Sequence, residues 1–264
     1  MAVPLQLLKH GTAAAANAAR RITRDTVGSL WVAACAHCNG ASDGPICAAC
    51  RWALDQMRKM SACRACGKTI ASADSSCTEC GGGGTHPVRR TIRMSPYAGV
   101  TAGMIRLAKF GGRWELATWL GQCLADQVAA DDVPDNAVIV PVPLHRRRKL
   151  TRGYDQAKLI AAAAAKRLHR PLLLPLRRCR PTSPQTSLQS TVARMENVRD
   201  AFIALPRVDL TGLPVLLVDD VLTTGSTLRA AARALEPLRP SSITALVVAV
   251  AGNQSGGIET FDDF

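Results

Sequence analysis

The chain has 264 residues, of which 47% are apolar and only 4% aromatic, enough for one sizeable core and a small second domain. Lysine and arginine outnumber aspartate and glutamate by 33 to 20, and the net charge of +13 indicates phosphorylated metabolites or nucleic acid as partners, unless it only forms a solvated basic surface. No apolar run is long enough to span a membrane, so we expect no membrane span.

Four segments are visible along the chain. The first has basic residues among Ala and Leu without the continuous apolar stretch of a secretory signal, so we expect a cytoplasmic protein with reduced cysteines. The last is acidic and ends in Phe264, like the tip of bacterial single-strand-binding proteins, or is simply a disordered end. The segments are a basic arm or helix at 1–34, a cysteine-rich domain at 35–86, an alternating strand–helix domain at 87–252 and the tail at 253–264.

Eight of the ten cysteines form four Cys-x-x-Cys pairs. Two such pairs make a closed tetrahedral site with no position for a water ligand, so we expect two structural Zn²⁺ ions. The spacing favours sequential sites, and an interleaved cross-brace is the alternative. The sequential sites are Cys35, Cys38, Cys47 and Cys50, followed by Cys63, Cys66, Cys77 and Cys80.

The third segment alternates apolar runs typical of buried strands with stretches of helical spacing. This order predicts an α/β fold with a parallel sheet covered by helices on both faces, whose ligands bind at the carboxyl ends of the strands. The expected helices are Leu107–Val128 with a break near Gly111-Gly112, Asp155–Leu168 and Leu228–Leu238, and the expected strands are Ala137–Val140, Val215–Val218 and Ile243–Val250.

The most specific pattern follows the second of these strands. Asp219 and Asp220 are adjacent carboxylates, which are the acceptors that a ribose diol needs. Gly225 lets backbone N–H groups approach a phosphate, and the following helix directs its positive dipole end at the anion. The neighbouring hydroxyls add donors to the same turn, and they belong to Thr223, Thr224, Ser226 and Thr227.

This motif resembles the signature of type I phosphoribosyltransferases. With the amino-terminal cysteine pairs, the chain looks like the ComF family of competence-associated, phosphoribosyltransferase-like proteins over residues 35 to about 250. The supporting motifs are Lys109-Phe110-Gly111-Gly112, Val140-Pro141-Val142-Pro143-Leu144, Arg152-Gly153-Tyr154-Asp155-Gln156, Gln185-Thr186-Ser187-Leu188 and Arg194-x-x-Asn197.

The resemblance implies a type I phosphoribosyltransferase-like sheet behind a small zinc-ribbon domain with four cysteines at each metal, and phosphoribosyl pyrophosphate (PRPP) bound with Mg²⁺. The 5′-phosphate would lie against Thr223–Thr227 and the ribose against Asp219 and Asp220. The pyrophosphate would meet Lys109, Arg152, Gly153 and Gln156, although Lys109 also fits a helix-terminal lysine.

Two further loops carry charged residues. In the transferase fold a mobile loop closes over the reaction; here it would lie at Arg180–Arg199, unless this is an ordinary surface loop. Arg180 and Arg194 would join Asp219 and Asp220 as catalytic residues, helped by Gln185 and Asn197. The run Arg146–Lys149 fits a solvated edge or a nucleic-acid patch.

One position departs from the family, which usually has asparagine where Asp155 stands. A carboxylate there would repel a polyanion unless it holds Mg²⁺ or an arginine. This substitution weakens the prediction for the pyrophosphate end of the site.

Three functions remain open: PRPP transfer to an unidentified acceptor, a non-catalytic adaptor in DNA uptake or processing, and a PRPP-responsive transcriptional regulator. The adaptor would use the loop as a phosphate or nucleotide sensor and would bind single-stranded DNA or DNA-processing proteins. The regulator ranks last because no helix-turn-helix is evident. The oligomeric state is not determined by the sequence.

Overall fold

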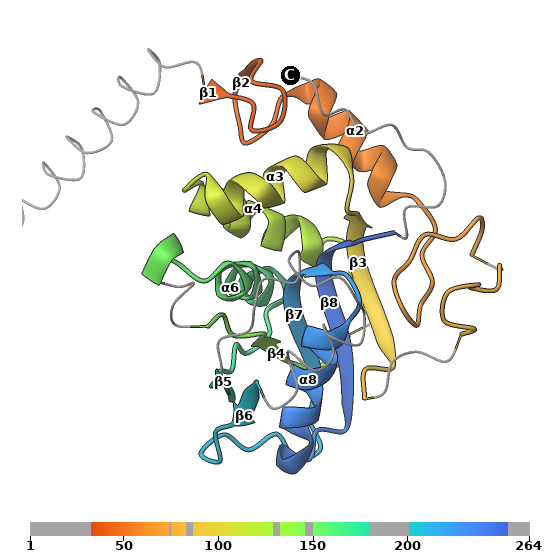
Figure 1. Cartoon of the computed structure of the whole chain (residues 1–264), viewed down its shortest axis with the longest axis vertical. Helices are drawn as coiled ribbons and strands as arrows, with labels where there is room; N and C mark the ends of the chain where they lie inside the picture. The colour runs from red at the N-terminus through yellow and green to blue at the C-terminus, as the bar shows by residue number, and fades with distance from the viewer. Residues whose placement is uncertain are drawn as a thin grey trace, which may run out of the picture. The chain divides into compact units, whose positions relative to one another are not determined.

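The computed structural model describes residues 33–73, 75–82, 87–128, 133–145, 150–179 and 201–252 (Figure 1). The chain divides into two compact units, Met1–Cys50 and Arg51–Phe264. The first contains a short antiparallel pair, β1 (Ala33–Ala34) and β2 (Ala41–Ser42), and helix α2 (Ala48–Arg58) begins at its end.

A four-stranded sheet forms the centre of the second unit, with strand order β3-β8-β7-β4 and every pair parallel. The predicted parallel sheet is therefore confirmed. All four strands end at the same edge. Asp219 and Asp220 lie on β7 near this edge, Thr223–Thr227 follow β7, and Arg152 and Gly153 follow β4. The strands are β3 (Arg90–Pro96), β4 (Val138–Pro141), β7 (Pro214–Leu222) and β8 (Ser242–Val250).

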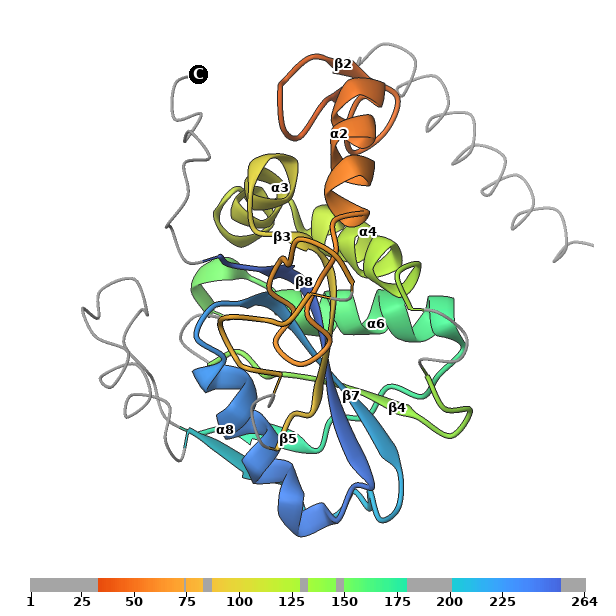
Figure 2. The same ribbon diagram turned by 90° about the vertical axis from the view of Figure 1, so that its right-hand side faces the viewer.

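Helices cover both faces of this sheet (Figure 2). Side chains alternate along β7: Val215 and Leu217 belong to the core cluster that contains Leu228 and Ala232 of α8 (Ser226–Leu235). Helix α4 (Trp114–Ala125) contacts β8 and β3, while α6 (Gln156–Leu168) contacts β7 and β4. Helix α3 (Gly99–Phe110) packs on α4. No helix among the described residues combines the length and apolarity needed to cross a bilayer.

Several predicted elements are confirmed, and others were missed. The predicted break near Gly111-Gly112 separates α3 from α4, and the Gly111 N–H donates to the Leu107 carbonyl at 2.8 Å. Strand β7 is longer than predicted, because it continues through Asp219 and Asp220. The elements without a sequence prediction are α2, β3, the pair of β1 and β2, and the antiparallel pair of β5 (Leu176–Arg178) and β6 (Phe202–Ala204).

The second cysteine-rich segment lies against the edge of the sheet, at β3. The Thr91 N–H donates to the Arg64 carbonyl at 2.8 Å, and the Thr91 hydroxyl donates to the Ala65 carbonyl at 3.0 Å. Arg93 is only 7% exposed and donates to the Thr69 hydroxyl at 2.9 Å. Burial lowers the pKa of Arg93 to about 10. An exposed strand edge invites pairing with another chain, and this segment covers part of it.

Candidate functional site

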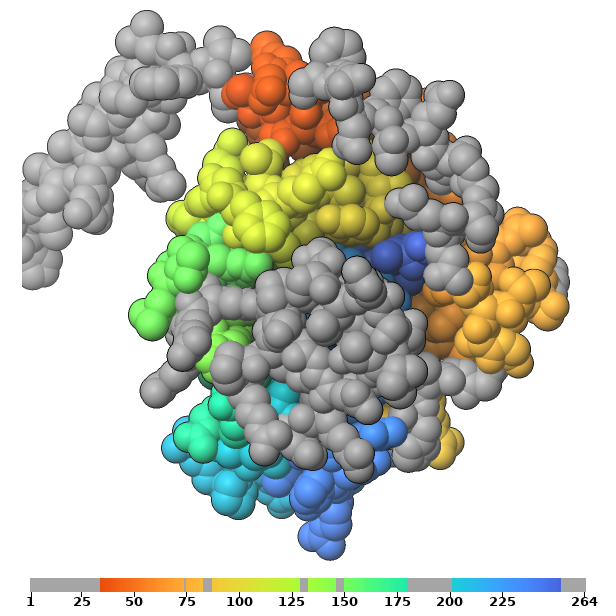
Figure 3. Space-filling model, in the orientation of Figure 1, coloured from red at the N-terminus to blue at the C-terminus, as the bar shows by residue number. Residues whose placement is uncertain are grey.

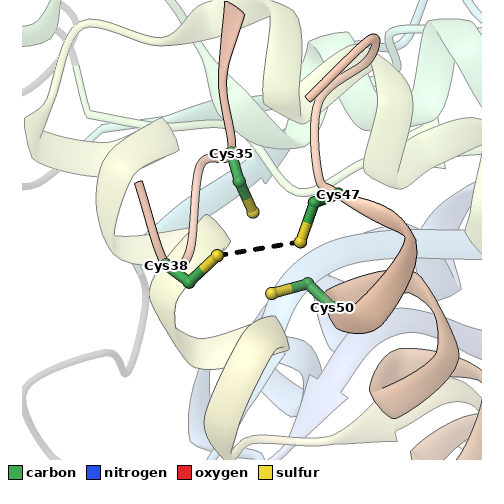
Figure 4. Close-up of side chains that lie close together, drawn as sticks. All are labelled: Cys35, Cys38, Cys47 and Cys50. Atoms are coloured by element: carbon green, nitrogen blue, oxygen red, sulfur yellow. Dashed lines mark hydrogen bonds between the residues drawn. The ribbon is translucent and has the colours of Figure 1, made fainter. Parts of the chain in front are cut away.

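The eight paired cysteines form two separate clusters, each with four Sγ atoms within 4.8 Å of one another. The Sγ atoms of Cys38 and Cys47 lie 3.7 Å apart (Figure 4), and the Cys63–Cys80 and Cys66–Cys77 distances are both 3.6 Å. Zn–S bonds of about 2.3 Å in a tetrahedron place the sulfurs about 3.8 Å apart, so both clusters fit Zn²⁺. The sequential grouping is confirmed and the cross-brace is wrong.

The local backbone explains how each pair faces one metal. The residue after the second cysteine has a positive φ in three of the four pairs: Asn39 (59°), Gly67 (74°) and Gly81 (56°). Asn and Gly tolerate this left-handed conformation best, and it folds the chain back so that both thiols point inward. The Gly67 N–H then donates to the Cys63 carbonyl at 2.8 Å. Four Sγ atoms therefore meet in each cluster, the number of ligands in a structural zinc site.

The hydroxyl-rich turn joins the end of β7 to α8. Gly225 is the residue before the helix, with a φ of 74°. The Thr224 and Ser226 hydroxyls are 3.1 Å apart, and Ser226 is buried. The first N–H groups of α8 therefore lie immediately beyond a turn that brings backbone and hydroxyls together, which is the geometry that anions favour.

The acidic pair lies on β7 just before this turn. Lys109 of α3 contacts Asp220, with Nζ 3.0 Å from Oδ1. The Asp220 N–H donates to Oδ1 of Asp219 at 2.8 Å. Burial, followed by the charge of Asp220, raises the pKa of Asp219 to about 7, although Lys109 and Arg178 oppose the shift. The two carboxylates therefore differ: Asp220 forms an ion pair with Lys109, whereas the pKa of Asp219 is raised to about 7.

This titration predicts a pH dependence of ligand binding. Below pH 7 Asp219 is mostly protonated in the folded chain, and an ionised carboxylate is the stronger acceptor for ribose hydroxyls. We expect PRPP affinity to rise severalfold as pH increases through about 7 and then to level off, measured by calorimetry between pH 6 and pH 8.5. In Asp219→Asn the rise should be smaller, since only the titration of PRPP remains. Identical profiles in both proteins would contradict the assignment.

The end of α3 connects the two predicted halves of the site. The Tyr154 hydroxyl and the Gln156 amide both donate to the Ala108 carbonyl, at 2.6 and 3.1 Å. Arg152 donates to the Gln156 side-chain oxygen at 3.1 Å. Ala108 directly precedes Lys109, which contacts Asp220. The residues predicted for pyrophosphate are thus brought together by α3, with Gly153 beside them at a φ of 78°.

Asp155 has a structural role that its sequence context did not reveal. Its Oδ1 accepts the Lys158 N–H at 3.1 Å as the N-cap of α6, and its Oδ2 accepts the Leu144 N–H at 3.1 Å. Two backbone N–H groups therefore hold this carboxylate in place. The repulsion of a polyanion by its charge stays a prediction.

Substituting Asp155 should consequently lower stability. We expect Asp155→Ala to lower the free energy of unfolding by about 2 kcal/mol, since the N-cap bond and the Leu144 bond are both lost. Asp155→Asn should cost less, because one acceptor oxygen remains for Lys158. Urea denaturation followed by circular dichroism measures both variants, and an alanine variant as stable as the unmodified protein would contradict this role.

The structure adds Arg178 to the predicted site residues. It lies on β5, its guanidinium is 5.2 Å from the Phe202 ring centroid, and its charge acts on Asp219. A basic residue at the end of a short strand is a weak sequence signal, so it was not predicted. The remaining predicted residues lie outside the described part of the chain: Arg180, Gln185, Arg194, Asn197 and Arg146–Lys149.

Comparison with known proteins indicates the family to which the chain belongs. Residues 159–262 match the phosphoribosyl transferase domain family. A DNA utilization protein, YhgH of Escherichia coli O6:H1, is 30% identical over 72% of this chain and 90% of its own length. Competence protein F of Haemophilus influenzae is 29% identical over 77% of this chain and 91% of its own length.

The chain belongs to the ComF family. Competence protein ComFC of Bacillus subtilis, another ComF relative, is 32% identical over 37% of this chain and 38% of its own length. Among solved structures, glutamine PRPP amidotransferase of Bacillus subtilis is 24% identical over 50% of this chain and 25% of its own, with a TM-score of 0.33.

Proposed function

We propose that this ComF protein binds PRPP or a related phosphoribosyl ligand at the carboxyl edge of β7, in a cytoplasmic role linked to DNA uptake or processing. The observation that carries the proposal is the continuity of one short segment: Asp219 and Asp220 follow the buried part of β7, and the turn around Gly225 after that strand leads directly into α8. A diol acceptor and an anion site thereby lie a few residues apart, as a ribose 5-phosphate requires.

Each group has a defined role in this binding. The ribose hydroxyls donate to Asp219 and Asp220, and the backbone and hydroxyls of Thr223–Thr227 hold the 5′-phosphate at the amino end of α8. The pyrophosphate meets Arg152 and Lys109. Because Lys109 already contacts Asp220 at 3.0 Å, the arriving diol competes with it and directs the ammonium toward the pyrophosphate.

Mg²⁺ fits the same residues. This cation takes oxygen ligands, usually one or two carboxylates together with substrate phosphates, and the adjacent Asp219 and Asp220 offer such carboxylates. When bound, it neutralises charge on the pyrophosphate as the C1–oxygen bond breaks. The protein's own contribution is to orient the ribose and fix the phosphate. We also propose that four residues take part in catalysis if the protein is a transferase: Asp219, Asp220, Arg180 and Arg194.

The link to DNA rests on the relatives, which are named for DNA utilization and competence, and on the net charge of +13. Eight zinc-binding thiols suit the reducing cytoplasm. The proposal includes one structural zinc ion in each cysteine cluster, whose four Sγ atoms lie close enough together to hold it.

Calorimetric titration with PRPP, with and without Mg²⁺, tests the proposal. We expect saturable binding at one site that tightens with Mg²⁺. Pyrophosphate release with a panel of nucleobases would then identify a transferase, while binding without release would identify a sensor. Absence of PRPP binding in both conditions would overturn the proposal.

A second candidate function is a non-catalytic adaptor for single-stranded DNA. The excess of 33 basic over 20 acidic residues favours it, together with the names of the relatives. Phosphate contacts release counterions, so affinity for a single strand should fall steeply with salt. Weak or salt-independent binding of a fluorescent oligonucleotide would exclude this function.

A further inference from the structure

Two large aromatic side chains are exposed at the turn between α3 and α4. Phe110 is 76% exposed and Trp114 is 56% exposed. Phe110 ends α3, and Trp114 begins α4, where its N–H donates to the Gly112 carbonyl at 3.0 Å. Figure 3 shows the yellow surface of α3 and α4 beside the green surface of the segment that leads into α6. Two large aromatic side chains exposed this close together make the turn a candidate binding surface.

The position of Phe110 is fixed by its neighbours. The preceding residues contact the candidate site, because Lys109 reaches Asp220 and the Ala108 carbonyl accepts bonds from Tyr154 and Gln156. The Gly111 N–H closes the end of the helix on Leu107. Phe110 therefore directly follows Lys109, whose ammonium group contacts Asp220, one of the two carboxylates proposed to bind the ribose.

One side of the Phe110 ring has a cationic neighbour. The Arg152 guanidinium lies 4.9 Å from the ring centroid, a cation–π distance, and the same guanidinium bonds to Gln156 of α6. Arg152 contacts the ring without burying it, since 76% of the residue stays exposed. An aromatic ring backed by an arginine is a platform on which a planar, polar ring stacks.

We propose that Phe110 stacks on the nucleobase of a ribonucleoside 5′-phosphate, a role that rests on the proposed phosphoribosyl site. Asp219 and Asp220 hold the ribose, the turn at Gly225 holds the 5′-phosphate, and the base extends toward Phe110. Two acceptors for a vicinal diol favour ribose over deoxyribose, so a ribonucleotide is the occupant. Phe110 is then the residue that distinguishes a nucleotide from the bare sugar phosphate.

A comparison of two ligands isolates the contribution of the base to binding affinity. Adenosine 5′-monophosphate (AMP) and ribose 5-phosphate share the diol and the phosphate, and only the first has a base. We expect AMP to bind about tenfold more tightly, because stacking on one aromatic side chain contributes a factor of that order. In Phe110→Ala the two affinities should become equal, with ribose 5-phosphate unchanged. Competition against PRPP, followed by calorimetry, measures both constants.

Two variants serve as controls. Phe110→Trp keeps an aromatic face and should retain the preference for AMP. Leu150→Ala removes another exposed apolar side chain, 84% exposed and two residues before Arg152, and should leave both affinities unchanged. Thermal unfolding of each variant checks that the fold is intact.

The outcomes separate the two proposals. If ribose 5-phosphate binds but AMP binds no more tightly, or if the preference survives in Phe110→Ala, the stacking role is overturned while the phosphoribosyl site stands. It is also overturned if Phe110→Ala weakens binding of a DNA oligonucleotide and leaves AMP unaffected. If neither PRPP nor ribose 5-phosphate binds, the proposed function fails, and the stacking role fails with it.

Discussion

The double substitution Asp219→Ala/Asp220→Ala should lower PRPP affinity at least about 100-fold, since a hydrogen bond to a charged group contributes about 1.5–3 kcal/mol and two are lost. It also leaves Lys109 without the carboxylate that lies 3.0 Å away. The folded state should tolerate the change, because the raised pKa of Asp219 means that its charge is disfavoured there. Calorimetric titration with PRPP and Mg²⁺ measures the loss.

A matched control is Asp209→Ala, which removes an exposed carboxylate that accepts the Thr211 N–H at 2.9 Å in the loop before β7. Its PRPP affinity should equal that of the unmodified protein. If the double variant binds PRPP as tightly as the unmodified protein, Asp219 and Asp220 do not hold the ribose, and the proposed site is overturned.

Loss of the second cysteine cluster should destabilise the whole second unit. In Cys63→Ser one thiolate of the cluster is removed, and the contacts from Arg64, Ala65 and Thr69 to β3 lose their support. Structural zinc contributes directly to folding free energy. We expect a loss of about 3 kcal/mol or more, which lowers the melting temperature by about 10 °C in a unit of this size.

Cys35→Ser is the matched comparison, because it removes a thiolate of the same kind from the first unit. Both variants should bind one zinc ion instead of two, measured by metal analysis of the purified protein. Only Cys63→Ser should lower the melting temperature of the second unit and weaken PRPP binding. Equal effects of the two substitutions would contradict a specific role for the second cluster at β3.

The parts of the site that depend on local pattern were predicted from the sequence. The spacing of the cysteines determined their grouping, because a Cys-x-x-Cys turn and a short connection leave few arrangements. The turn at Gly225 was predicted because a glycine between a strand and a helix lets backbone N–H groups approach a phosphate, and the structure gives this residue a φ of 74°. The roles of these residues in binding a ligand, and the domain boundaries at 86 and 252, stay predictions.

Other features depend on residues far apart in the sequence. Strand β3 was missed because Arg93 interrupts its apolar pattern, and only the fold brings it to the Thr69 hydroxyl. The contact between Lys109 and Asp220 joins α3 to β7, which no spacing rule relates. The bond from the Leu144 N–H to Asp155 likewise joins residues that only the fold brings together.

The strand order has a consequence for synthesis of the protein. The last strand of the described residues, β8, lies between β3 and β7, so the sheet cannot close until Val250 has emerged from the ribosome. Until then β3 lacks its neighbour in the sheet, a state prone to aggregation. The Arg64 carbonyl, which accepts the Thr91 N–H, comes from a metal-binding segment made just before β3. Early zinc loading would therefore protect the nascent chain, and zinc-starved cells should accumulate it in aggregates.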